Sequence, residues 1–479
     1  MLKYTTCYRD LSYLGIPIII GQIGTIVMSF TDTLMIGHHS TPELAAASFV
    51  NNMFTLVIIL ALGFSYSITP TVGSHYGREE YQRIGQILKN GIAGNMVLAF
   101  LLVGVMALLY WNLGNLGQPE ELLPLMRPYF LVQLVSLPFV CFANAFKQFY
   151  DGITNTRTPM YILLIGNVLN IIGNWILIYG KLGLPEMGLL GAGLSTLIAR
   201  IFVAFAFVWV FVISRFYQQY RKGWQSKGVS MDEIRKLSTL GIPIALQMGL
   251  ETGAFSLSSL LVGWIGTTAL AAHQIMLTIS QLGFMIYYGF GAAVAIKVSL
   301  CVGLRNYDDA GRYSHAGFHL AMMCATAVTI PIVIFRDSLG ILFTDNVEVC
   351  QLVSALVLPF VIYQVGDCLQ CAYSNGLRGL SVVKPLVPVA FFAYFVVSLP
   401  IGYLLGLPLG LKGFMNCLSM GSDTFLIASS PITAPRHEPL SQEICTVPIS
   451  STNSTVPSVP LIGACSSSIL IRTTLIPFG

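Results

Sequence analysis

The sequence predicts an all-α membrane protein built from two parallel repeats of six helices. Three observations lead to this fold class. Of the 479 residues, 55% are hydrophobic and only 10% are charged, whereas soluble domains carry about 25% charged residues. Apolar runs long enough to cross a bilayer follow one another along the chain, and the pattern of the first half recurs in the second. A chain of this composition cannot cover a water-facing surface, so the lipid bilayer is its expected solvent.

Eleven apolar runs satisfy the length of a spanning helix, about 20 mainly apolar residues. They lie at about residues 14–36, 44–73, 88–111, 124–146, 160–180, 188–214, 240–264, 270–300, 315–335, 348–373 and 386–407. The chain is thereby divided into an N-terminal lobe (1–214), a charged cytoplasmic linker (215–239), a C-terminal lobe (240–413) and a tail (414–479).

The charges of the loops predict the direction of the spans. If the N-terminus is inside, most loop Lys and Arg lie on that side, including Arg378 and Lys384 in the last inner loop. The opposite loops carry only Arg127, Lys181, Arg336 and Lys412. Because positively charged loops stay in the cytoplasm, we expect a multi-pass protein of the cell inner (plasma) membrane with a cytoplasmic N-terminus.

An internal repeat relates the two halves. Leu14–Ile18 recurs as Leu240–Ile244, so that Pro17 falls on Pro243 at an offset of 226 residues. Each unit should hold an even number of spans, so both enter from the same side as parallel repeats. Two lobes with a cleft between them are the geometry that alternating access requires. Proline bends a helix, and each of these two prolines is either a hinge or a static kink.

The second repeat ends early. The first continues into a sixth helix, whereas residues 414–479 are rich in Ser, Thr and Pro and contain no run of 20 apolar residues. Such composition is typical of a disordered tail. Because the pattern is lost abruptly at one point, we interpret the twelfth helix as missing or frameshifted.

Four ionisable residues fall inside predicted spans, where charge is costly and marks functional candidates. They are Asp32, Arg200, Glu251 and Asp367. The carboxylates are hard oxygen ligands that suit a proton or Na⁺, and they also suit a cationic drug. The alternative for Asp32 is a structural salt bridge with Arg200. For Arg200 itself we expect a structural role.

Two sets of polar residues share helix faces. The fifth span carries Asn167, Asn170 and Asn174 at spacings of three and four. These amides either contact a ligand or join helices by hydrogen bonds. The eighth span carries Gln274, Gln281 and Tyr288 at spacings of seven, a polar stripe predicted to face the substrate cavity.

Several motifs together resemble the multidrug and toxic compound extrusion (MATE) transporters, in the NorM-like branch. The first is Phe30–Gly37 in the first span, the second Gly191–Thr196 at the start of the sixth, and the third Leu270–Ile275 at the start of the eighth. Glu251 and Gln364–Asp367 complete the set. Each is weak alone, but together with the parallel repeat they are specific.

The resemblance implies a twelve-helix fold that exchanges organic cations or drugs for H⁺ or Na⁺. The first-lobe cation site that it implies consists of Asp32, Asn167, Asn170 and Thr196. The acids of the C-terminal lobe, Glu251 and Asp367, would form a second coupling site and would be the ligands if Na⁺ is the coupling ion. The family's fifth helix can carry a further Asp where this chain has Asn174, so the first site would be less charged.

The expected partners are a small organic cation or drug and the lipid bilayer, with no nucleic acid. We expect a monomer with no cofactor other than the coupling ion, and no enzymatic activity.

Two other functions compete with this interpretation. A lipid-linked oligosaccharide flippase of the same superfamily would need a basic cavity for pyrophosphate, whereas the charges inside the spans are mostly acidic. An intramembrane enzyme could use Asp32 and Asp367 as an acid pair, but it would not explain the two-lobe repeat.

Overall fold

The computed structural model describes residues 4–404 except 116 and 118. Across these residues the secondary structure is helical, with no strand, and eleven helices are long and apolar enough to cross a membrane. The predicted all-α membrane fold is thereby confirmed. The tail predicted at 414–479, including the question of the twelfth helix, lies outside the described residues.

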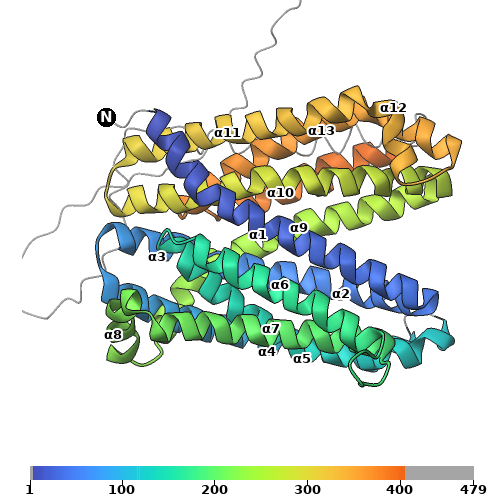
Figure 1. The fold of residues 1–479 in the computed structure, drawn as a ribbon. Helices are drawn as coiled ribbons and strands as arrows, with labels where there is room; N and C mark the ends of the chain where they lie inside the picture. The colour runs from blue at the N-terminus through green and yellow to red at the C-terminus, as the bar shows by residue number, and fades with distance from the viewer. Residues whose placement is uncertain (1–3, 116, 118, 405–479) are drawn as a thin grey trace, which may run out of the picture. The chain divides into compact units, whose positions relative to one another are not determined.

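The helices form two groups, visible as the lower and upper halves of Figure 1. The N-terminal lobe consists of α1 (Tyr4–His39), α2 (Thr41–Ser65), α3 (Ile68–Gly77), α4 (Tyr81–Trp111), α5 (Leu123–Gly152), α6 (Arg157–Ile178) and α7 (Gly188–Ile213). A short helix, α8 (Gln218–Ser226), follows. The C-terminal lobe consists of α9 (Met231–Ile265), α10 (Thr267–Gly303), α11 (Tyr307–Ile334), α12 (Arg336–Leu339), α13 (Val347–Gly379) and α14 (Leu386–Phe391), which continues as a π-helix (Phe392–Ser398).

The start of α9 differs from the sequence prediction. This helix begins at Met231, inside the segment 215–239 assigned to the linker. Asp232 and Glu233 lie in its first turn, where negative charge is favourable beside the helix dipole. At the other end Gly266 has φ of 150° and joins α9 directly to α10, a conformation that favours glycine.

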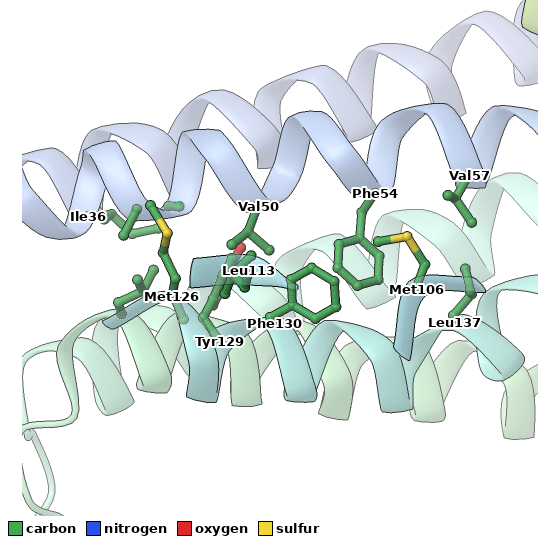
Figure 2. Close-up of a cluster of buried hydrophobic side chains, with 14 of the residues drawn as sticks. Ile36, Val50, Phe54, Val57, Met106, Leu113, Met126, Tyr129, Phe130 and Leu137 are labelled. Carbon is green, nitrogen blue, oxygen red and sulfur yellow. The ribbon is translucent and has the colours of Figure 1, made fainter. Parts of the chain in front are cut away.

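Each lobe has its own hydrophobic core on one side of the bundle. We call the side on which α1 begins the N-side and the side on which α1 ends the far side. The far-side core of the N-terminal lobe is drawn in Figure 2, where Phe54 of α2 packs against Phe130 of α5. The matching far-side cluster of the C-terminal lobe includes Val262, Met276 and Phe360. Each of these two clusters takes its buried residues from one lobe.

On the N-side, by contrast, the clusters combine both lobes. Leu11 and Leu14 of α1 pack with Val294 of α10 and Tyr313 of α11. Leu237 of α9 packs in turn with residues of α3, α4 and α5. The first helix of each lobe therefore places its N-side half against the other lobe.

Both helices later return to their own lobe. In α1, Gly15 lies against Phe290 of α10, whereas Gly24 lies against Leu164 of α6. Pro17 is buried between these two glycines, in the segment where α1 passes from one lobe to the other. Its role as a hinge, like that of Pro243 inside α9, stays a prediction.

Small residues allow the lobes to approach closely on the N-side. Gly63 of α2 lies against the backbone of Ala245 in α9. Gly77 of α3 lies against Gly303 of α10. A side chain at any of these glycines would separate the two backbones, so the N-side contact depends on their absence of a Cβ.

Candidate cation sites in the two lobes

The site in the N-terminal lobe is centred on Asp32 of α1, which is half-buried. Asn174 of α6 donates a hydrogen bond to Asp32 Oδ1 at 2.5 Å. The amide of Asn170, one turn away on the same helix, lies 2.8 Å from Asp32 Oδ1 and 3.1 Å from the hydroxyl of Thr196 on α7. Because Asp32 can only accept when ionised, the amide NH₂ faces Asp32 and the amide oxygen accepts from Thr196. Three helices thus converge on one carboxylate.

A small cavity opens beside this carboxylate. Its volume is about 50 Å³, and its lining includes Asp32, Asn51 of α2, Tyr129 of α5 and Thr196. A space of this size can hold a water molecule, and a bare monovalent cation is no larger. Carboxylate, amide and hydroxyl oxygens are the donors that such a cation prefers.

Three of the four residues predicted for this site lie together, and one lies apart. Asn167 is beside Gly24 of α1, two helical turns before Asn174, and its amide nitrogen is buried without a hydrogen-bond partner. Asn174, which the sequence placed on the same polar face but which the resemblance did not include in the site, contacts Asp32 in its place. The spacing put all three asparagines on one face, but it did not indicate which of them reach α1.

Arg200 of α7 is bonded to α5. Its guanidinium donates to Gln133 Oε1 at 2.8 Å and to the hydroxyl of Ser136. No ion pair joins Arg200 to Asp32 among the residues that the structure describes. These contacts support the structural role expected for Arg200, and they give no support to a salt bridge with Asp32.

The C-terminal lobe holds the second pair of acids. Asp367 of α13 is 2% exposed and accepts a hydrogen bond from Tyr287 of α10. Glu251 of α9 is half-buried and interacts with Gln370 of α13. Tyr394, in the π-helix that follows α14, donates to Gln370 Oε1 at 2.6 Å. The two acids interact electrostatically, so a cation that binds between them would relieve their repulsion.

The two sites differ in chemistry although their scaffolds repeat. Within residues 4–404, no group of three or more His, Cys, Asp or Glu could hold a metal ion. Each lobe instead combines acids with neutral donors: amides and a threonine around Asp32, tyrosines and glutamines around Glu251 and Asp367. Such sites suit a proton, Na⁺ or an organic cation.

The predicted polar stripe of α10 is divided by the lobe contact. Gln274 and Gln281 are exposed on α10, whereas Tyr288 is buried. The hydroxyl of Tyr288 is hydrogen-bonded to that of Tyr66, in the joint between α2 and α3. The far-side part of the stripe is thus accessible, and its N-side end is covered by the N-terminal lobe.

Two similar lobes, each with a carboxylate site inside its spanning helices and joined along one side of the bundle, define a multi-pass membrane transporter. A family model described as MatE matches residues 17–176 and 243–404. The chain belongs to the MatE family and is a NorM-like member of it. The two matches begin 226 residues apart, at Pro17 and Pro243, which confirms the internal repeat. Members of this family are transporters, not enzymes.

Known proteins agree with this assignment. The multidrug resistance protein NorM of Vibrio vulnificus (strain CMCP6) is 28% identical over 420 residues, which cover 86% of this chain and 92% of NorM. The multidrug resistance protein MdtK of Proteus mirabilis is 30% identical over 417 residues, which cover 85% of this chain and 89% of MdtK. Among solved structures, a MATE in the straight conformation matches with a TM-score of 0.82 at 19% identity, covering 89% of this chain and 95% of that one.

Proposed function

We propose that this protein is a multidrug efflux transporter that exports organic cations in exchange for H⁺ or Na⁺. The family supports transport, and relatives named for multidrug resistance support drugs as the cargo. The observation that carries the exchange mechanism is the presence of acids inside the spanning helices: half-buried Asp32 in one lobe, and half-buried Glu251 with buried Asp367 in the other. A flippase would bind pyrophosphate, which these acids would repel.

The arrangement of the lobes supports alternating access. Contacts between the lobes lie on the N-side, while the far-side cores belong to separate lobes. In this state the carboxylates would be reached from the far side. The opposite state would need the N-side contacts to separate and the far-side halves to close.

Exchange follows if the coupling ion and the cargo compete for the same acids. Binding of either cation then lowers the affinity for the other by the same factor. The distribution of Lys and Arg favours a cytoplasmic N-terminus in the inner membrane. With that orientation, an inward ion gradient would load Glu251 and Asp367 from outside and release the drug there.

The experiment is uptake of a fluorescent organic cation into inverted vesicles that contain the full chain. An imposed proton or sodium gradient should drive uptake. Glu251→Gln or Asp367→Asn should reduce uptake by at least about tenfold, because each removes a negative charge that binds the coupling ion, and a loss of about 1.4 kcal/mol of binding free energy corresponds to a factor of ten. The matched control is Asp308→Asn, which removes an exposed carboxylate on the N-side and should leave uptake unchanged. Uptake that requires no ion gradient and is unchanged in both Glu251→Gln and Asp367→Asn would overturn the proposal.

A further inference from the structure

Arg378, near the N-side end of α13, is a buried cation that neither candidate site uses. Its side chain is 7% exposed. One guanidinium nitrogen donates to Gln247 Oε1 of α9 at 3.1 Å, and Nε is buried without a hydrogen-bond partner. A buried guanidinium is costly unless its N–H groups are paired. Arg378 therefore keeps an unused donor inside the C-terminal lobe.

The position of Gln247 places Arg378 beside the acid site. Gln247 precedes Glu251 by four residues on α9, and residues at this spacing are neighbours on one helix face. On α13, Gln370 contacts Glu251 and precedes Arg378 by eight residues, about two turns. The guanidinium thus lies on the N-side of Glu251, and the two charges interact electrostatically.

The opposite side of Arg378 meets the other lobe. Its Cζ atom lies 5.6 Å from the centre of the Tyr66 ring, within the distance of a cation–π interaction. Tyr66 belongs to the N-terminal lobe, and its hydroxyl is hydrogen-bonded to Tyr288 of α10. Arg378 is thus located between the acid of one lobe and the N-side contact with the other.

The groups around the guanidinium come from four elements. Glu251 on α9, Tyr288 on α10 and Cys371 on α13 itself interact with its charge, and Tyr66 faces it from the α2–α3 joint. Of these, the carboxylate is the group whose charge changes when a coupling ion binds or leaves. The state of Glu251 is therefore the variable that the guanidinium can sense.

We propose that Arg378 is a positioning residue that couples occupancy of Glu251 to closure of the lobes on the N-side. When a proton or cation neutralises Glu251, Arg378 stays on Tyr66 and Gln247 and the N-side contact is favoured. When Glu251 is empty and ionised, it attracts the guanidinium about one turn along α9 and away from Tyr66, which weakens the contact. The inference rests on the proposed function, because it takes Glu251 as a site for the coupling ion.

The test measures lobe closure directly, in the full chain reconstituted in nanodiscs. Genetically encoded spin labels at the exposed positions Arg78 and Asp308 report the distance between the N-side loops of the two lobes. In the wild type, the coupling ion, tested as Na⁺ and as acidic pH, should raise the closed-to-open ratio by about tenfold, within the usual range of coupling between sites. Arg378→Gln should abolish this response. A response of wild-type size in Arg378→Gln would overturn the proposal.

A matched pair at Tyr66 separates the ring from its hydroxyl. Tyr66→Phe keeps the aromatic face and should keep the ion response, whereas Tyr66→Leu should lose it even if Arg378→Gln does not fold. An equal response in both variants would also overturn the proposal. Competition between the coupling ion and an organic cation, measured on the same samples, should persist in Tyr66→Leu. Absence of that competition in the wild type would instead count against the proposed function.

Discussion

Asn170 and Asn174 both place amide nitrogens against Asp32, while Arg200 is bonded to α5. The charge of Asp32 is therefore balanced by the neutral amide donors, by its electrostatic interaction with Arg200 and by whatever cation enters the adjacent cavity. An asparagine at position 32 keeps one carbonyl oxygen for these amides, so it preserves part of the network. Removal of Arg200 would instead leave Gln133 and Ser136 without their shared donor.

We predict that Asp32→Asn and Arg200→Gln affect different properties of the protein. The first should change stability little and weaken binding of the coupling ion, because the ionised oxygen is lost. The second should lower stability by about 2–4 kcal/mol, since hydrogen bonds to a charged group are worth about 1.5–3 kcal/mol each and are not fully additive. Thermal unfolding of the solubilised protein, monitored by size-exclusion chromatography, measures the stability of both variants. The rise in unfolding temperature when the coupling ion is added measures its binding. Equal destabilisation by the two substitutions would favour the structural salt bridge between Asp32 and Arg200.

Residue identity alone located the acids, but not all of their partners. Asp32, Glu251 and Asp367 were found because charges inside apolar spans are rare. Asn174 could not be ranked above Asn167 because both lie on one helix face. Arg378 was counted as a loop charge, since the predicted span ended at residue 373, whereas α13 continues to Gly379 and buries it. Hydropathy cannot recognise an arginine that is buried between Gln247 of its own lobe and Tyr66 of the other.

At the scale of the helix, α10 shows how closely the two lobes meet. Its last residue, Gly303, lies against the backbone of Ser74 in α3. A Cβ at this position would contact main-chain atoms, which cannot rotate away as a side chain can. By contrast, Gly253 of α9 has open space where its Cβ would lie.

We predict that Gly303→Ala separates α10 from α3 and shifts the protein toward an N-side-open state. Gly253→Ala, the control, introduces the same methyl group into open space and should leave the equilibrium unchanged or stabilise α9 by up to about 1 kcal/mol through its helix propensity. The spin-label distance between positions 78 and 308 measures the shift. A closed state of unchanged population in Gly303→Ala would show that α3 and α10 can part without opening the lobes.

The helices themselves were well predicted, and their interruptions were not. All eleven predicted spans correspond to helices long enough to cross a membrane. The second predicted span is divided at Tyr66 and Ser67 into α2 and α3, because an apolar run does not reveal a local change of direction. That joint carries the tyrosine that meets Arg378 and Tyr288.

For the whole molecule, the repeat predicted two similar lobes but not how they meet. An offset of 226 residues establishes equivalence between α1 and α9. It does not indicate that the N-side half of each packs on the opposite lobe, because self-similarity carries no information about contacts between the copies. The exchange of half-helices ties each lobe to the first helix of the other, so movement of the lobes must bend or tilt α1 and α9.

The repeat also predicts a counterpart of α7 in the C-terminal lobe. In the N-terminal lobe α7 packs on both α5 and α6 and contributes Thr196 and Arg200 to the polar network. The offset places the equivalent helix at residues 414–439, where the sequence is interrupted by Pro431, Pro435 and Pro439. Proline inside a helix removes backbone hydrogen bonds, and unpaired backbone groups in lipid cost several kcal/mol each.

We therefore predict that a reading frame shifted near codon 413 encodes the helix equivalent to α7. Translation of the other two frames should reveal one apolar run of about 20 residues, the length that crosses a bilayer. A chain restored in that frame should unfold at a higher temperature than the present chain, because the new helix would cover α13 and α14 as α7 covers α5 and α6. Transport driven by the ion gradient should rise with it. If neither alternative frame contains such a run, the frameshift is rejected and residues 414–479 belong to the sequence of this transporter.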